Sequence, residues 1–361
     1  MNFSTTRVNS SELNEDNYVS TENMLQDYQG IVDAKSVPED VNVISFSCGD
    51  ILISNIRPYL KKVWKATYNG GCSSDVFVLK ANDYIESDYL HYVIANDKFI
   101  NFVMSGAKGV KMPRGDKKQM KTYCLSLPQI QEQKKIATLL RLIDERIATQ
   151  SKIIEDLKKL KSAIIDYAIN SLNSDFAKFD SLYEMAGEGG TPTTSNASFY
   201  DNGKIPFIKI DDLKQKYLTE NKDFITELGL QKSSAWLVPT RSILFSNGAT
   251  IGEITITTYP VCTKQGILGI VPKQNIDVEF LYYFMSSSYF KKAISRIVTE
   301  GTMKTAYLKD INNILCPIPT KEKQQEIAKM PSTLNSKIDF EQSILKLFCS
   351  QKQYLLRQMF I

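Results

Sequence analysis

The residue types that perform catalysis are few and scattered along this chain of 361 residues. His91 is the single histidine, which leaves little room for acid–base or nucleophilic chemistry that depends on histidine. Asp211-Asp212 could hold a metal ion, but paired acids before a helix are usually caps. Gly187-Glu188-Gly189-Gly190 is a lone glycine cluster, typical of a turn. With no Walker-type phosphate loop, no Asn/Asp-Pro-Pro-Tyr-like segment and no nuclease cluster, we expect neither catalysis by this chain nor a cofactor.

Cysteine usage and hydropathy exclude several further classes. No two of the six cysteines (48, 72, 124, 262, 316 and 349) have a metal-ligand spacing, so we expect buried, unpaired thiols and no zinc site. No stretch approaches the roughly 20 continuous apolar residues of a membrane span. The first six residues lack the character of a signal peptide, so we expect a cytoplasmic protein without a membrane partner.

The chain contains an internal repeat, which bears on how its parts are arranged. Gly49–Asn55 resembles Arg241–Asn247 at an offset of 192, and Asp88–Tyr92 resembles Glu279–Tyr283 at an offset of 191. The offset of 191 also relates Leu127-Pro128 to Ile318-Pro319, Gln133 to Gln324, and Ile136-Ala137 to Ile327-Ala328. A period this long is not that of a solenoid and indicates two copies of a domain plus a connector.

Each connector carries the alternating four-and-three spacing of a coiled-coil seam. In the first, the seam is Ile136, Leu140, Ile143, Ile147, Gln150, Ile154, Leu157, Lys161, Ile164 and Ala168. In the second, it is Leu334, Ile338, Glu341, Leu345, Phe348, Lys352, Leu355 and Met359. The polar interruptions Glu341 and Lys352 lie 191 residues after Gln150 and Lys161. We therefore expect two related helices that pack on each other; the alternative is that each helix only covers its own domain.

Geometry sets the direction of the helix pair. A first helix of about 45 residues is ~65 Å long at 1.5 Å per residue. The segment between the helices, roughly 176–318, has an expected radius of gyration of only ~15 Å. It cannot carry the chain back along such a helix, so we expect an antiparallel pair with the globular segments at opposite ends. Met330-Pro331 lies inside the second helix, where we expect a kink or a restart with Pro331 in a first turn.

Both globular segments mix short strands with brief helices, which predicts an α+β fold with a pseudo-twofold internal repeat. In the second copy we expect strands at 205–210, 242–246, 253–257 and 266–271, a tight turn at Asn247-Gly248, and a helix over 278–297. In the first we expect strands at 50–55 and 75–79 and a helix near 87–104. By the offset of 191, Met1 corresponds to Pro192, so the opening strand of the first copy is expected to be missing.

The order segment, helix, segment, helix resembles the specificity subunit of Type I restriction-modification systems, across nearly the whole chain. The motifs that carry this resemblance are Gly189–Pro192, Ile205–Lys209, Ser246–Gly252, Leu127-Pro128 with Gln131–Ala137, its second copy at 317–328, and Leu355–Phe360. The resemblance implies a non-catalytic subunit in which each recognition domain reads half of a bipartite target in double-stranded DNA. It also implies that the helices set the spacing and dock two methyltransferase subunits, with restriction (translocase-nuclease) subunits joining outside.

The corresponding boundaries are 1–127 for the first recognition domain, 128–175 for the central helix, 176–318 for the second domain and 319–361 for the final helix. Two alternatives stay open: a recognition subunit of a related methyltransferase-nuclease system, and a coiled-coil interaction scaffold that does not bind DNA.

Basic residues beside the expected strands are the candidates for phosphate contacts, although a net charge of +4 alone does not indicate nucleic acid. Between 108 and 121 there are six of them against the single acid Asp116: Lys108, Lys111, Arg114, Lys117, Lys118 and Lys121. Other candidates are Lys61, Lys62 and Lys65 around Trp64, and in the second copy Lys209, Lys214, Lys216, Lys264 and Lys304. Asn55, Asn247 and Gln265 are weaker candidates for amide contacts to adenine edges.

Overall fold

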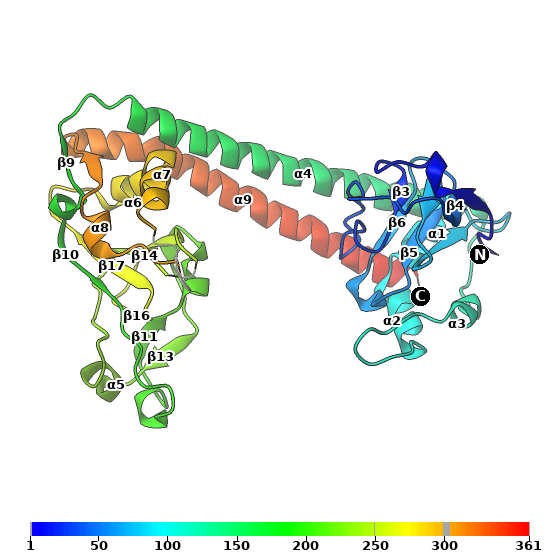
Figure 1. Ribbon diagram of the computed structural model, residues 1–361, viewed down its shortest axis with the longest axis horizontal. Coiled ribbons are helices and arrows are strands. Elements are labelled where there is room, and N and C mark those ends of the chain that lie inside the picture. The colour runs from blue at the N-terminus through cyan, green and yellow to red at the C-terminus, as the bar shows by residue number, and fades with distance from the viewer. Residues whose placement is uncertain (1, 249, 299–303, 361) are drawn as a thin grey trace. The chain divides into compact units, whose positions relative to one another are not determined.

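The computed structural model describes residues 2–248, 250–298 and 304–360. The chain divides into two compact units, Met1–Ser151 with Ser343–Ile361, and Lys152–Gln342. Each unit holds one globular module and a part of each of two long helices, α4 (Ile130–Asn170) and α9 (Lys321–Met359), which Figure 1 shows in green and red. No helix among the described residues is long and apolar enough to cross a membrane.

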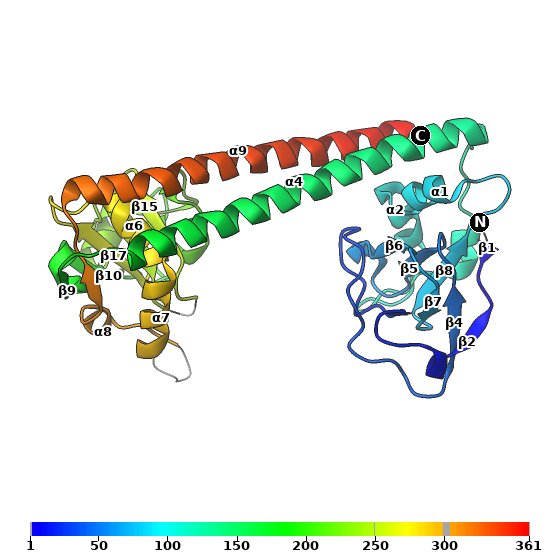
Figure 2. The same ribbon diagram turned by 90° about the horizontal axis from the view of Figure 1, so that it is seen from above.

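The first module contains two four-stranded sheets, one of which carries the helices. That sheet has the order β1 (Asn2–Phe3), β8 (Val76–Lys80), β5 (Ile51–Ser54) and β6 (Val63–Lys65). The other has the order β2 (Arg7–Asn9), β4 (Asn42–Phe46), β7 (Gly70–Cys72) and β3 (Tyr18–Val19). Helices α1 (Ser87–Ile94) and α2 (Asp97–Ser105) share a core with β5 through Ile51, Tyr89 and Phe99. Figure 2 shows α1 beside the β6–β5–β8 sheet.

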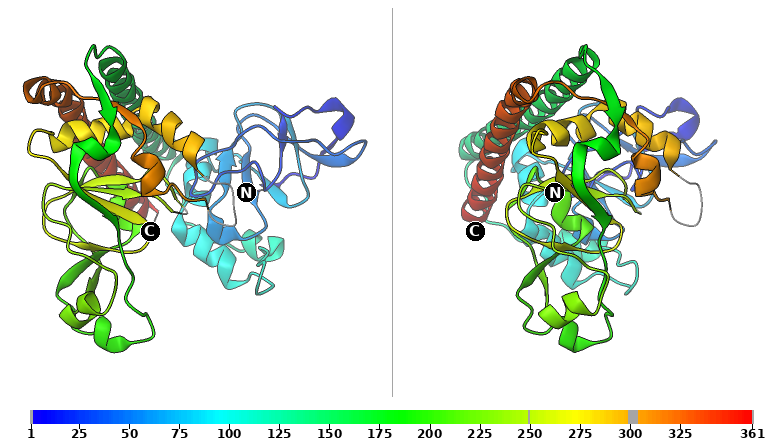
Figure 3. Two further views of the ribbon diagram at one scale, coloured as in Figure 1. Left: turned by 60° about the vertical axis from the view of Figure 1, so that its left-hand side comes forward. Right: turned by 90° about the vertical axis from the view of Figure 1, so that its left-hand side faces the viewer.

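The second module repeats this sheet in a larger setting. Its five-stranded sheet has the order β10 (Tyr183–Glu188), β17 (Ile267–Pro272), β14 (Ile243–Ser246), β15 (Ile254–Thr257) and β12 (Tyr217–Leu218). A three-stranded sheet of β13 (Asp223–Ile225), β11 (Ile205–Ile208) and β16 (Cys262–Thr263) forms a separate lobe. Helices α6 (Val278–Ser286) and α7 (Ser288–Ile297), yellow in Figure 3, lie on the five-stranded sheet away from that lobe. A small sheet of β18 (Leu315–Pro317) and β9 (Phe176–Lys178) completes the module.

The predicted α+β fold with an internal repeat is confirmed. β5 pairs with β8 through Ile51 and Leu79, and β14 pairs with β17 in the equivalent register through Ile243 and Ile270. Two local predictions were wrong. The helices expected over 87–104 and 278–297 are each broken in two, because Asn96 and Ser287 stop one helix and cap the next with their side chains. Asn247-Gly248 does not close a tight turn, since β15 begins only at Ile254.

The expectation that the first module lacks its opening strand is corrected. β1 pairs with β8 through Asn2 and Lys80, at the same sheet edge where β10 pairs with β17 through Met185 and Val271. These two pairs are equivalent although Asn2 and Met185 are 183 residues apart, not 191. An insertion or deletion between two positions changes their offset in sequence, whereas the pairing of the strands is unchanged. The first module therefore has this strand, shortened to two residues against six in β10.

Within the first unit, α4 and α9 run antiparallel. Ala137 and Leu140 near the start of α4 share a core with Phe360 after the end of α9. Further along, the carboxylate of Asp144 pairs with the ammonium group of Lys352 at 2.5 Å. Successive residues of α4 therefore contact residues of decreasing number on α9, as predicted for an antiparallel pair.

The second unit shows the same direction independently. The ammonium group of Lys161 donates to the side-chain oxygen of Asn335 at 2.9 Å. Ile165 and Ile169 of α4 share a core with Ala328 of α9. Of the kink or restart expected at Pro331, the restart is contradicted, because α9 continues through this residue. Pro331 is buried, and its neighbours Ala328 and Ser332 contact the second module, so tertiary contacts hold a helix that proline alone would weaken.

A buried glutamine joins each module to its long helix. The amide nitrogen of Gln133 donates to the carbonyls of Pro128 (2.9 Å) and Tyr84 (3.0 Å), and its oxygen accepts from the backbone N–H of Glu86 (2.9 Å). Gln324 makes the same three bonds with the equivalent positions of the second unit, Pro319 (2.9 Å), Asn275 (3.3 Å) and Asp277 (2.7 Å). Both side chains are almost inaccessible to water, at 0% and 1% exposure. This explains why both glutamines stand at the repeat offset.

We expect Gln324→Met to lower the stability of the second unit by about 3 kcal/mol, because it leaves two carbonyls and one N–H buried without partners. Thermal and urea unfolding of the full chain measure this loss. The control is Gln325→Met, an exposed neighbour on the same helix turn. Equal stability of the two variants would contradict the proposed joint.

Candidate nucleic-acid interface

The basic segment of the first module folds as a hairpin between α2 and α3 (Lys117–Lys121). Lys108 and Arg114 exchange two backbone hydrogen bonds of 3.0 and 2.9 Å across its base. Their side chains are paired with acids, Lys108 with Asp116 at 3.1 Å and Arg114 with Asp75 at 2.8 Å. Arg114 therefore holds the hairpin in place, although its side chain remains 54% exposed.

The remaining cations of this segment differ in how free they are. Lys111 and Lys118 are exposed, and no side-chain partner is recorded for either among the described residues. Lys117 and Lys121 both lie over the ring of Phe3, at 4.7 and 5.9 Å from its centroid. The hairpin thus presents the uncommitted ammonium group of Lys111, and α3 presents that of Lys118 beside two that rest on an aromatic face.

The candidates around Trp64 are committed to contacts inside the module. Lys61 pairs with Asp97 at 2.8 Å, and Lys65 pairs with Asp88 at the start of α1. Lys62 donates to the carbonyl of Thr21 at 2.6 Å, and burial lowers its pKa. Trp64 packs against Phe46 and Tyr68. These three lysines are half-buried, so they stabilise the sheet edge and are weaker candidates for phosphate contacts than Lys111.

In the second module the predicted cations also separate into two groups. Lys209 pairs with Asp223 at 2.8 Å, and Lys214 pairs with Asp211 at 3.1 Å. The neighbouring Asp212 accepts from the backbone N–H of Lys209 and so acts as a cap, as predicted. Lys264 and Lys304 are exposed. Lys304 lies at a cavity of about 360 Å³ that is lined by Phe245, Ile251, Met285, Phe290 and Ile294.

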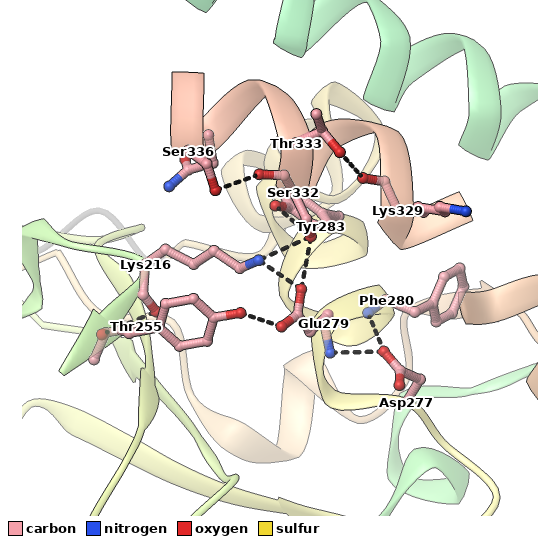
Figure 4. Close-up of polar contacts among 12 residues, drawn as sticks. Lys216, Thr255, Asp277, Glu279, Phe280, Tyr283, Lys329, Ser332, Thr333 and Ser336 are labelled. Carbon is pink, nitrogen blue, oxygen red and sulfur yellow. Dashed lines mark hydrogen bonds and ion pairs between the residues drawn. The ribbon is translucent and has the colours of Figure 1, made fainter. Parts of the chain in front are cut away.

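Lys216 is not available to DNA, which corrects its place among the candidates. Its side chain is 3% exposed, and its ammonium group contacts the carboxylate of Glu279 at 2.5 Å and the hydroxyl of Ser332 at 3.0 Å. Tyr217 also donates to Glu279, and Tyr283 bonds to Ser332. Figure 4 shows Lys216, which precedes β12, converging with Glu279 of α6 and Ser332 of α9. The network fastens the module to α9, and nothing in the local sequence indicated that Lys216 would be buried.

The amide candidates lie deeper than expected. Asn247 is 1% exposed, and its side chain donates to the carbonyl of Ala306 at 3.2 Å. The side-chain oxygens of Asn55 and Asn247 are both buried without a partner among the described residues. In each module the backbone carbonyl of this asparagine accepts from an equivalent N–H, of Gly115 or Ala306. Both asparagines therefore hold the chain after the central strand, and only Gln265 is exposed.

The fourteen apolar seam residues are buried or half-buried, and none is exposed. The least exposed are Leu140 at 0%, Ile338 at 4%, and Ile143 and Ile154 at 6%. The rest are Ile136, Ile147, Leu157, Ile164, Ala168, Leu334, Leu345, Phe348, Leu355 and Met359. The polar interruptions Lys161 and Lys352 have the partners described above, and these partners, Asn335 and Asp144, are themselves 191 residues apart.

In the described part of the chain, no group of three or more His, Cys, Asp or Glu residues could hold a metal ion. Desolvation lowers the pKa of His91 to about 4, with Lys352 contributing, so the imidazole is neutral at physiological pH. All six cysteines are free, but the prediction that they are buried was wrong for three, because Cys48, Cys124 and Cys349 are exposed.

Comparison with known proteins places this geometry in a family. Residues 4–159 and 173–347 each match the family model of the Type I restriction modification DNA specificity domain. The chain is 26% identical over 331 residues to the putative type I restriction enzyme MjaX specificity subunit of Methanocaldococcus jannaschii, covering 84% of this chain and 75% of that protein. It is also 26% identical to the MjaVIII specificity subunit of the same organism, covering 75% of this chain and 69% of that protein.

Solved structures show the same fold. The S subunit of a Type I restriction-modification system from M. genitalium matches with a TM-score of 0.57 at 17% identity, covering all of this chain and 96% of that one. A chain from a study of complex assembly and conformational transition in the type I R-M system matches with a TM-score of 0.62 at 16% identity, covering 98% and 96%. The protein has the architecture of a DNA specificity subunit. It belongs to the Type I restriction modification DNA specificity family, in two copies of the domain.

The Lys216–Glu279 pair makes a stability prediction. Burial alone would raise the pKa of Glu279, but hydrogen bonds from Lys216, Tyr217 and Ser332 lower it below 4.5. We expect Glu279→Gln to destabilise the second unit by about 3 kcal/mol, because Lys216 keeps its charge in a buried position without a counter-ion. Thermal unfolding at pH 7 measures this loss, and Lys216→Met/Glu279→Gln should recover part of it.

The pH dependence provides the control for this prediction. Because its folded-state pKa is depressed, Glu279 contributes stability that is present above the unfolded pKa near 4.5 and is lost as the pH falls through the lower folded value. The parent should therefore lose more stability between pH 5 and pH 3 than Glu279→Gln does. Parallel curves would show that the carboxylate does not stabilise the fold.

Proposed function

We propose that this chain is the sequence-recognition subunit of a Type I restriction-modification complex and performs no chemistry itself. The proposal rests on a repeated joint: each copy of the specificity domain is attached to a long helix by an equivalent buried glutamine, Gln133 or Gln324. A subunit that reads two half-sites needs each reader to be attached firmly to a spacer. The repeated joint attaches each module to a long helix within its own unit, whereas a protein with a single binding domain would need only one such joint.

The two modules read the two halves of a bipartite duplex target in this proposal. Exposed and uncommitted cations make the phosphate contacts, namely Lys111 and Lys118 in the first module and Lys264 and Lys304 in the second. The paired cations Lys61, Lys65, Lys209 and Lys214 shape the surface around them. Because the loops that carry these groups differ between the modules, the two half-sites differ in sequence and the target is asymmetric.

The long helices set the spacing between half-sites and dock the enzymes. α4 has 41 residues and is therefore about 60 Å long, which corresponds to fewer than two turns of duplex. Large apolar side chains remain exposed along the helices, among them Leu142 at 47% and Leu160 at 49% on α4 and Phe340 at 59% and Leu347 at 68% on α9. Apolar side chains along long helices suit partner helices. We propose that two methyltransferase subunits dock there, that restriction subunits join outside, and that the complex acts in the cytoplasm.

Removing uncommitted cations should weaken binding to every sequence. We expect Lys111→Ala/Lys118→Ala to lower affinity and to reduce the slope of log K against log salt by roughly 1.8, since each phosphate contact contributes about 0.9. Fluorescence anisotropy of duplex DNA with the chain bound to its methyltransferase partner measures both quantities.

The control for the cation prediction is Lys35→Ala, an exposed lysine of the same module that lies outside the basic segment. An unchanged salt slope in the double variant would exclude these lysines as phosphate contacts. Absence of any DNA shift by the unaltered complex would instead favour a coiled-coil scaffold without a DNA role.

A charge in the helix seam should prevent assembly. We expect Ile154→Glu to separate α4 from its surroundings and abolish docking of the methyltransferase subunits, because Ile154 is only 6% exposed. Size-exclusion chromatography and melting of the complex report this. The matched control is Ser151→Glu, an exposed polar position on the same helix turn. A seam variant that assembles and melts like this control would refute the seam.

A further inference from the structure

The hairpin of the first module has a fixed base. The backbone N–H of Arg57 donates to the carbonyl of Pro113 at 2.7 Å, and that of Gly115 donates to the carbonyl of Asn55 at 3.0 Å. Pro113 and Gly115 are buried, and the Arg114–Asp75 ion pair lies beside them. These contacts attach the returning arm of the hairpin to the chain that leaves β5, the central strand. The base therefore cannot shift without breaking several hydrogen bonds.

The tip of the same hairpin is apolar and lies in solvent. Gly109 adopts a φ of +95°, which glycine tolerates at no steric cost and which turns the chain at the tip. Val110, next to it, is 101% exposed, more than any other large apolar side chain in the described part of the chain, and Met112 is 48% exposed. Figure 1 shows the segment between α2 and α3 looping away from the sheets.

Single exposed apolar residues are common on protein surfaces and need no special cause. Here, however, two of them share one anchored turn and flank Lys111, which is itself exposed. The acid nearest in sequence, Asp116, is already paired with Lys108. Such a tip is complementary to a surface that is apolar in its centre and anionic at its edges. Duplex DNA has this character at an opened base step, because the faces of the bases are apolar and two rows of phosphates flank the groove.

We propose that Val110 and Met112 form an apolar wedge that enters a groove of the DNA and presses against a base step. Lys111 neutralises a phosphate beside the wedge, while Lys108 stays paired with Asp116 at the base of the hairpin. The proposal rests on the DNA-recognition function above and deepens it. A wedge partly unstacks the step and bends the duplex, so the first module would select its half-site by the deformability of that step as well as by base-edge contacts.

The test separates the wedge from phosphate contacts through salt dependence. The probe is a duplex recovered from a random-sequence library by the unaltered chain in complex with its methyltransferase partner. We expect Val110→Ser/Met112→Ser to weaken binding to this probe about tenfold at every salt concentration while leaving the salt slope unchanged. In contrast, Lys111→Ala should reduce the slope by about 0.9.

A second readout reports the distortion directly. Thymines unstacked by a wedge become reactive to permanganate, and we expect this reactivity within one half-site to disappear in the serine double variant. Val110→Leu/Met112→Leu keeps the apolar character and should retain both affinity and reactivity. The matched control is Val32→Ser/Val41→Ser, which removes two other exposed apolar side chains of the same module, 51% and 44% exposed.

The outcomes distinguish the wedge from the function on which it rests. Failure of the unaltered complex to recover or bind any duplex would overturn the DNA-recognition function itself. Normal DNA binding by the serine variant, with thymine reactivity equal to that of the control, would overturn the wedge alone. Loss of methyltransferase assembly in the serine variant with DNA binding retained would also overturn it, and would show that the tip docks a protein.

Discussion

The rest of the structure depends on the hydrogen bonds of one buried glutamine in each copy of the repeat. Gln133 and Gln324 each bridge the start of a long helix and the loop that opens the first helix of a module. Since each is excluded from water, any rotation of module against helix would leave polar groups unsatisfied at a cost of roughly 1–3 kcal/mol each. The joint is thus stiff in a way that an apolar contact, which has no direction, would not be.

The two modules keep this joint while they differ elsewhere. At the equivalent first-turn positions of α1 and α6 stand Asp88 and Glu279, and each pairs with a lysine. The lysines are not equivalent, however: Lys65 comes from β6, whereas Lys216 precedes β12, a strand present in the second module only. The same electrostatic requirement is met from different parts of the chain. This is the pattern expected if the attachment to the helices is constrained and the surfaces that read the target are free to change.

Much of the framework could be predicted because it depends on local patterns that repeat. The seam of α4 and α9, the repeated glutamines and the central strands are each visible in a short window of residues. What failed depended on distant contacts. The residues near Lys216 in sequence do not indicate that it is buried, because its partners Glu279 and Ser332 come from other elements. Pro331 stays within a helix only because the module packs on both sides of it, and β1 is recognisable only by its pairing with β8.

Contacts between distant residues also explain why the number of basic residues alone did not identify which cations are free to contact DNA. Of the six basic residues between 108 and 121, Lys108 and Arg114 pair with acids, and Lys117 and Lys121 lie over an aromatic ring. The first two charges hold the hairpin in shape and the other two rest on Phe3 of β1, which leaves Lys111 and Lys118 without a side-chain partner among the described residues. A loop that contacts DNA has to solve two opposed problems, since phosphate attraction favours free cations whereas readout of one step requires a rigid backbone. In the proposed mode of binding, fewer cations remain for phosphate contacts, but these cations and the apolar tip meet the duplex at a defined position.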